Sequence, residues 1–123
     1  MRRILLSVIA TFLLAAPALA DGDAAKGEKV FGKCKACHDV VSDKNKVGPT
    51  LHGVIGRKAG AVEGFKYSEA MTGSGITWDV TTLTAYLKDP KGYVPGNKMA
   101  FTGLKKDEDV VDVIAYIQEA STK

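Results

Sequence analysis

Two cysteines and a histidine lie within five positions, Cys34-Lys35-Ala36-Cys37-His38, and the chain has no other cysteine. A Cys-x-x-Cys-His segment can belong to a zinc site, a redox dithiol, a disulfide or a covalent haem attachment. No second Cys-x-x-Cys pair is present to complete a zinc site, and no βαβ pattern provides the setting of a thioredoxin-type dithiol. A disulfide between Cys34 and Cys37 would close too short a loop to stabilise the domain much.

Covalent haem attachment uses all three side chains of this segment. Two thiols add to the porphyrin vinyl groups as thioethers, and the adjacent histidine offers a ring nitrogen to the iron. We therefore expect one haem c per chain, attached through Cys34 and Cys37, with His38 as an axial iron ligand. His52, the other of the two histidines, is expected to be a loop residue and no ligand.

The identity of the sixth iron ligand distinguishes an electron carrier from a haem protein that binds external molecules at the iron. Methionine, a soft thioether, favours ferrous iron and raises the reduction potential. Besides the initial Met1 the chain has Met71 and Met99. Met99 lies in YVPGNKMAFTG, where Pro95 and Gly96 indicate a turn and no helical stripe accounts for a methionine, so its context favours Met99. An open sixth position would instead indicate a gas sensor or a peroxidase, and a structural dithiol protein would hold no haem.

The first part of the chain predicts export. Residues 1–20 have the order of a secretory signal peptide: a basic start with Arg2 and Arg3, an apolar run, and a small-residue end at Ala20. The apolar run is shorter than the ~20 residues that a bilayer-spanning helix needs. Cleavage would leave residues 21–123 as one domain without a membrane anchor. Removing the two arginines leaves 15 of the 17 basic residues against 14 acids, and such a near-neutral chain is not expected to bind nucleic acid.

Capping residues and apolar periodicity predict an all-α domain with irregular chain between three main helices. The main helices are expected at about 23–35, 80–88 and 106–120, and a short one at 68–71. Asp23 and Asp79 are suited to cap the first two main helices, and Pro90 to close the second. Gly27 in the first helix indicates the close approach of another backbone. The segment DPKGYVPGNKMAFTG is expected to form an extended loop.

Six segments are spread in order along the chain from Cys34 to Ile117: CKACH, VGPTLHGVIGRKAG, GFKYSEA, GITW, LTAYLKDPKGYVPGNKMAF and VIAYI. As a set they resemble the class I c-type cytochromes, which include the mitochondrial protein and the small bacterial cytochromes c2. The resemblance implies the cytochrome c fold, with helices and loops wrapped round a covalently bound haem. It also implies thioethers at Cys34 and Cys37 and axial ligation by His38 and Met99.

The same resemblance assigns residues around the haem. Pro49 matches a carbonyl that accepts a hydrogen bond from the histidine ligand, and Tyr86 matches a residue beside the methionine sulfur. Gly27 and Phe31 match a contact with Tyr116 between the first and last helices. Further members of the haem surroundings are Arg57, Tyr67, Trp78 and Asn97, which match residues near a propionate, together with Phe101, which can pack the methionine loop.

Two positions depart from the usual family pattern. Met71 stands where asparagine is common in the mitochondrial proteins, and Asn97 stands where threonine is common. Replacing the amide by the Met71 thioether removes a hydrogen-bonding group from the space beside the haem.

The resemblance implies a monomeric periplasmic one-electron carrier and not an enzyme. Its donor would be a membrane cytochrome bc complex, and its acceptor a terminal oxidase or a photosynthetic reaction centre. Lysines near the exposed haem edge would steer the carrier to acidic docking sites. Lys33 and Lys35 flank the first expected thioether, and five more lysines lie in segments that resemble the rim of the exposed haem edge in this family: Lys46, Lys91, Lys98, Lys105 and Lys106.

Overall fold

The computed structural model describes residues 22–123, and the expected signal peptide lies outside that range. Within the described range the secondary structure consists of helices, which confirms the all-α prediction. In chain order they are α1 (Ala24–Phe31), α2 (Glu69–Thr72), α3 (Val80–Lys88), α4 (Pro90–Tyr93) and α5 (Asp107–Ala120). One isolated antiparallel bridge joins Lys58 to Thr77 and brings two loop segments together.

Side-chain caps begin the helices where the sequence predicts them. The Asp23 carboxylate accepts hydrogen bonds from the main-chain N–H groups of Ala25 and Lys26, which lack partners inside α1. Asp79 and Thr82 form a reciprocal capping box at the start of α3. The α-helix of α1 ends at Phe31, four residues before the predicted end, because the chain beyond it continues as hydrogen-bonded turns.

The expectation of an extended loop after α3 is wrong at its first residues. Pro90 ends α3 but also begins α4, because a proline at the first helical position needs no main-chain N–H. The Asp89 carboxylate accepts a hydrogen bond from Gly92 N at 3.0 Å and caps this short helix. The remaining loop, from Val94 to Gly103, then crosses to the start of α5.

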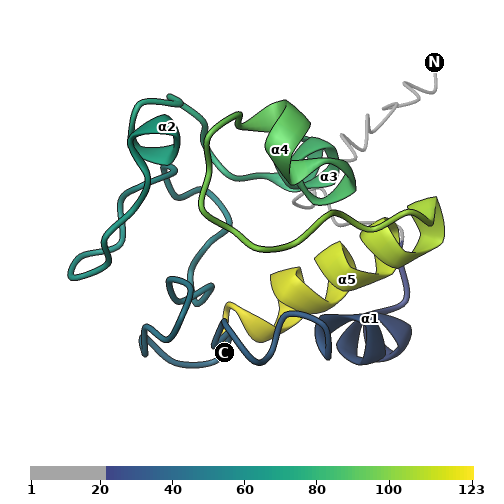
Figure 1. Ribbon diagram of the computed structural model, residues 1–123. Coiled ribbons are helices and arrows are strands. Elements are labelled where there is room, and N and C mark those ends of the chain that lie inside the picture. The colour runs from purple at the N-terminus through teal and green to yellow at the C-terminus, as the bar shows by residue number, and fades with distance from the viewer. Residues whose placement is uncertain (1–21) are drawn as a thin grey trace, which may run out of the picture.

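The helices α1 and α5 pack directly against each other, and Figure 1 shows them side by side at one end of the molecule. The contact is close at Gly27, where a Cβ atom would collide with the carbonyl oxygen of Asp112 and lie 2.9 Å from Tyr116 Cβ. Beside it the rings of Phe31 and Tyr116 lie 5.3 Å apart between centroids. This packing confirms the contact expected between Gly27, Phe31 and Tyr116.

The core lies between α5 and the segments that cover it. The α5 stripe predicted from the sequence, Val110, Val113, Ile114 and Ile117, is buried. Other buried apolar residues come from α1, α3 and the loops: Phe31, Val40, Val54, Trp78, Leu83, Tyr86, Val94 and Leu104. None of the helices between residues 22 and 123 is long and apolar enough to cross a bilayer.

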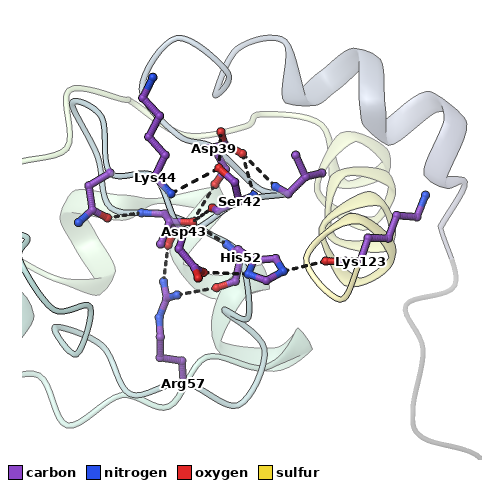
Figure 2. Close-up of polar contacts among 10 residues, drawn as sticks. Asp39, Ser42, Asp43, Lys44, His52, Arg57 and Lys123 are labelled. Carbon is purple, nitrogen blue, oxygen red and sulfur yellow. Dashed lines mark hydrogen bonds and ion pairs between the residues drawn. The ribbon is translucent and has the colours of Figure 1, made fainter.

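The loop that follows the Cys-x-x-Cys-His segment is joined by His52 to the residues that follow α5 (Figure 2). The His52 ring lies 2.9 Å from the Asp43 carboxylate through Nδ1 and 2.9 Å from the Lys123 carbonyl through Nε2. Nearby, Gly53 N donates to the carbonyl of Ser121 at 2.9 Å. His52 is therefore a loop residue, as expected, and its ring joins two segments of the chain.

Substituting Gly27 by alanine tests the contact between α1 and α5. The added methyl group has no space against the Asp112 carbonyl, so we expect Gly27→Ala to lower the free energy of unfolding by about 1–3 kcal/mol. Denaturant unfolding of the holoprotein measures this change. Lys26→Ala, at an exposed position of the same helix, should change stability by less than about 0.5 kcal/mol. Equal midpoints for Gly27→Ala and the wild type would contradict the close contact.

Titration of His52 should make stability depend on pH. The hydrogen bond to Asp43, followed by that to the Lys123 carbonyl, raises the pKa of His52 above its ordinary value of 6.5. The stabilisation is therefore complete below that value and is lost as the pH rises through the higher folded pKa. We expect this loss in the wild type and a flatter profile for Asp43→Asn, measured as unfolding free energy against pH. Parallel profiles for the two proteins would show that the pair contributes nothing.

Candidate functional site

The chemically active side chains predicted from the sequence surround one cavity of about 360 Å³. That volume lies within the ~300–1,000 Å³ range of small-molecule and cofactor sites. The predicted residues that line it are Lys33, Cys34, Cys37, His38, Pro49, Arg57, Tyr67, Trp78, Tyr86, Asn97, Lys98, Met99 and Phe101, together with Met71. The cavity is bounded mostly by apolar groups, with a few polar side chains among them. It thus brings together parts of the chain that are up to 84 residues apart, Lys33 and Ile117.

The Cys-x-x-Cys-His segment follows α1 in a helical turn. His38 N donates to the carbonyl of Cys34 at 2.9 Å, and Cys37 N donates to the same carbonyl at 3.1 Å. Residues three and four positions apart in such a turn share one face, so all three reactive side chains meet the cavity. The cysteines are not joined as a disulfide. Burial raises the pKa of the Cys34 thiol, which suits an uncharged sulfur at this position.

His38 is oriented by the loop that follows it. Its Nδ1 lies 2.7 Å from the carbonyl oxygen of Pro49, and a carbonyl only accepts, so Nδ1 carries the proton. The lone pair of Nε2 is then available for a metal. Burial lowers the pKa of His38, which favours this neutral ring. Gly48 is required here because a Cβ atom would lie 2.7 Å from His38 Nδ1.

Met99 enters the cavity from the loop between α4 and α5. The Tyr86 hydroxyl is 3.8 Å from Met99 Sδ and donates to it, as expected for a residue beside the sulfur. Burial raises the pKa of Tyr86 to about 12, so the hydroxyl keeps its proton. Met71, on α2, also lines the cavity and is half-buried. Both candidate methionines thus reach the site, but a hydrogen bond to the sulfur holds only Met99 among the described residues.

Polar residues predicted to surround a propionate also reach the cavity. Arg57 donates to the carbonyls of Thr50, at 2.8 Å, and His52, at 3.1 Å (Figure 2). A guanidinium has five N–H groups, so further donors remain for an anion. The Tyr67 hydroxyl accepts a hydrogen bond from Val62 N at 3.1 Å and keeps its own proton to donate. Buried Trp78 packs on Tyr86, with ring centroids 5.0 Å apart.

These residues fit a haem in their chemistry. Two thiols, an imidazole with an available Nε2 and a thioether meet in one mostly apolar space, and cationic and hydroxyl donors suit carboxylates. The zinc alternative is not supported: between residues 22 and 123, no three His, Cys, Asp or Glu side chains gather closely enough to hold a metal ion. His52 does not line the cavity.

Some cavity residues were not predicted as site residues, although they lie in segments that carry the family resemblance. Val47 lies at the cavity although its surface is 78% exposed, and Phe65 and Lys66 belong to the same wall. Val113 and Ile117 were expected in the core from the α5 stripe, and they also line the cavity. Loop residues such as Val47 follow no periodicity, so only their position in space assigns them to the site.

The expected docking lysines are all exposed but differ in their distance from the cavity. Lys33 and Lys98 line it, whereas Lys35, Lys46, Lys91, Lys105 and Lys106 do not. The Lys46 ammonium donates to the carbonyl of Lys35 at 2.8 Å, which fixes its charge close to the cysteine segment.

Comparison with known proteins agrees with this geometry. Residues 24–121 match the family model described as Cytochrome c. Cytochrome c2 iso-2 of Magnetospirillum fulvum is 61% identical over 88 residues, which cover 72% of this chain and 92% of that protein. Cytochrome c2 of Blastochloris viridis is 46% identical over 120 residues, 97% of this chain and 94% of that protein.

A solved structure supports the same assignment. Cytochrome cH from Methylobacterium extorquens superposes with a TM-score of 0.76 at 52% identity, over 80% of this chain and 99% of that one. The chain therefore belongs to the cytochrome c family: it is an electron-transfer protein, not an enzyme, and its cofactor is covalently attached haem c.

Proposed function

We propose that this chain is a periplasmic one-electron shuttle whose haem is attached through Cys34 and Cys37 and ligated axially by His38 and Met99. The observation that carries the proposal is that all four side chains line one cavity, with His38 Nδ1 bonded to Pro49 so that Nε2 is available. When bound, the haem supplies an iron that cycles between the ferrous and ferric states.

The protein residues would set the potential and the access to this site. The Met99 thioether favours ferrous iron, and its hydrogen bond from Tyr86 keeps the sulfur oriented. Buried Trp78, Leu83 and Val113 exclude water from the cavity wall, which disfavours the extra charge of the oxidised state. Arg57 and Tyr67 provide donors for the carboxylates, so no buried negative charge would be left without a partner.

The proposed location and partners rest on the sequence and on the relatives. Residues 1–20 have the pattern of an export signal. Relatives named cytochrome c2 support a small carrier that moves between redox partners. We propose a cytochrome bc complex as the donor, and a terminal oxidase or a photosynthetic reaction centre as the acceptor. Lys33 and Lys98, at the cavity, would guide the encounter with acidic surfaces.

The methionine ligand is tested by near-infrared absorption of the ferric holoprotein. Wild type should show the weak methionine-sulfur-to-iron band. Met99→Ala should abolish it and lower the reduction potential by on the order of 100 mV or more. The matched control, Met71→Ala, removes the other methionine of the cavity and should keep the band. Loss of the band only in Met71→Ala would assign Met71 as ligand, and its absence from the wild type would favour peroxide or gas chemistry.

The docking role of the lysines is tested by ionic strength. We expect Lys98→Glu to slow electron transfer from the bc complex on the order of tenfold at low salt, because charge steering accelerates encounter. The difference should shrink towards 1 M salt, where the Debye length falls to about 3 Å. Lys26→Glu, an equal charge change on α1 away from the cavity, should have little effect. Equal slowing by both variants, or slowing independent of salt, would contradict a local docking surface.

A further inference from the structure

Asn97 is a buried amide whose hydrogen-bonding groups are all committed to the main chain. Its exposed fraction is 7%. Its Nδ2 group donates to the carbonyls of Pro90, at 2.8 Å, and Val94, at 2.9 Å, and its Oδ1 accepts from Met99 N at 2.9 Å. The partners fix the orientation of the amide, since a flipped group would place an oxygen against two carbonyl oxygens.

These three bonds join the end of α4 to the residue that enters the cavity. The carbonyls of Pro90 and Val94 already accept from the main-chain N–H groups of Val94, at 3.0 Å, and Asn97, at 3.1 Å. Main-chain hydrogen bonds therefore already close the turns between Pro90 and Asn97. The Asn97 amide bonds to the same two carbonyls and also to Met99 N. The bond from Asn97 Oδ1 to the N–H two residues later is an Asx turn, which places Met99 relative to the closed turn.

The rest of the Met99 loop has few ties of its own. Within residues 98–103, all of them described, Met99 N is the only main-chain N–H group with a hydrogen-bond partner in the protein. The next main-chain bond along the chain joins Leu104 N to the carbonyl of Leu87 at 2.8 Å. An unpaired, partly exposed stretch opens readily unless a side chain holds it. Asn97 is the side chain in that position.

The family resemblance places Asn97 near a propionate, and the structure shows which partners its amide already has. The amide group has two N–H donors, and both have carbonyl partners. Threonine, usual at this position in the family, has one O–H donor and could not make the same three bonds. The departure from threonine therefore changes what this side chain can do.

We propose that Asn97 is a positioning residue that clamps the Met99 loop and so keeps the methionine in the cavity. This inference rests on the proposed function in one respect, that Met99 is the ligand that the clamp retains. Loss of the clamp frees the loop and exposes the sixth position to small external ligands. The clamp acts through Met99.

The experiment compares three variants of the holoprotein with the wild type. Asn97→Leu keeps the branched shape of the side chain and removes all three hydrogen bonds, because two methyl groups replace the amide oxygen and nitrogen. Asn97→Ser keeps an acceptor for Met99 N and loses at least one carbonyl bond. Ile114→Val is the matched control, because it weakens the buried α5 core away from the cavity. Imidazole affinity of the ferric protein and the pH at which the methionine-to-iron band disappears report on opening of the loop.

We expect Asn97→Leu to bind imidazole at least tenfold more tightly than the wild type and to lose the band at lower pH. Asn97→Ser should fall between them, and Ile114→Val should match the wild type. Wild-type imidazole affinity in Asn97→Leu would overturn the clamp, as would an equal change in Ile114→Val, since opening would then follow from general instability.

Hydrogen exchange of wild-type amides tests the clamp without any variant. The Met99 amide should exchange at least tenfold more slowly than the amides of Lys98 and Ala100. Equal rates would overturn the clamp even where the methionine-to-iron band is present, and the proposed ligation would then stand alone. Absence of that band from the wild type would count against the ligation and not against a protected Met99 amide.

Discussion

The close contact between α1 and α5 at Gly27 is the constraint on which the site depends. The contact is possible because glycine lets the backbone of α1 approach the Asp112 carbonyl. The turn that follows α1 carries Cys34 to His38, while α5 contributes Val113 and Ile117 to the cavity wall. The helix contact therefore sets the distance between the haem attachment segment and the apolar wall that faces it. A longer side chain at Gly27 would move both sides of the cavity apart.

Two loops, one with Pro49 and one with Met99, place the remaining side chains at the cavity, and a few hydrogen bonds hold each loop. Pro49 accepts from His38 and selects the tautomer that leaves Nε2 available. Asn97 connects Met99 to the end of α4, and Tyr86 donates to the Met99 sulfur. A chain of this size has limited capacity for a core, so a cofactor that occupies the centre compensates for its loop content. The site and the stability of the fold are consequently coupled.

Electrostatics divides the surface around this centre. Lys33 and Lys98 lie at the cavity, whereas Lys88 pairs with Asp107 at 2.8 Å at the start of α5. The acids of the first α5 turn, Asp107, Glu108 and Asp109, directly follow Lys105 and Lys106 in the sequence. Lys33 and Lys98 form no ion pair with the described residues, so they leave positive charge at the cavity although the expected mature chain is nearly neutral.

Local interactions explain what the sequence determined by itself. Asp23 and Asp79 cap helices through neighbours two or three residues away, and Cys34, Cys37 and His38 share a face by helical spacing. The cofactor class, the helices and the α5 stripe follow from such short-range patterns. The family resemblance, and no local pattern, predicted which distant residues share the cavity. Tertiary structure alone decided that His52 bonds to a carbonyl 71 positions away and that both donors of Asn97 are taken by main-chain carbonyls. The physical reason is that these contacts depend on where separate segments meet in space, and no local period or cap encodes that meeting.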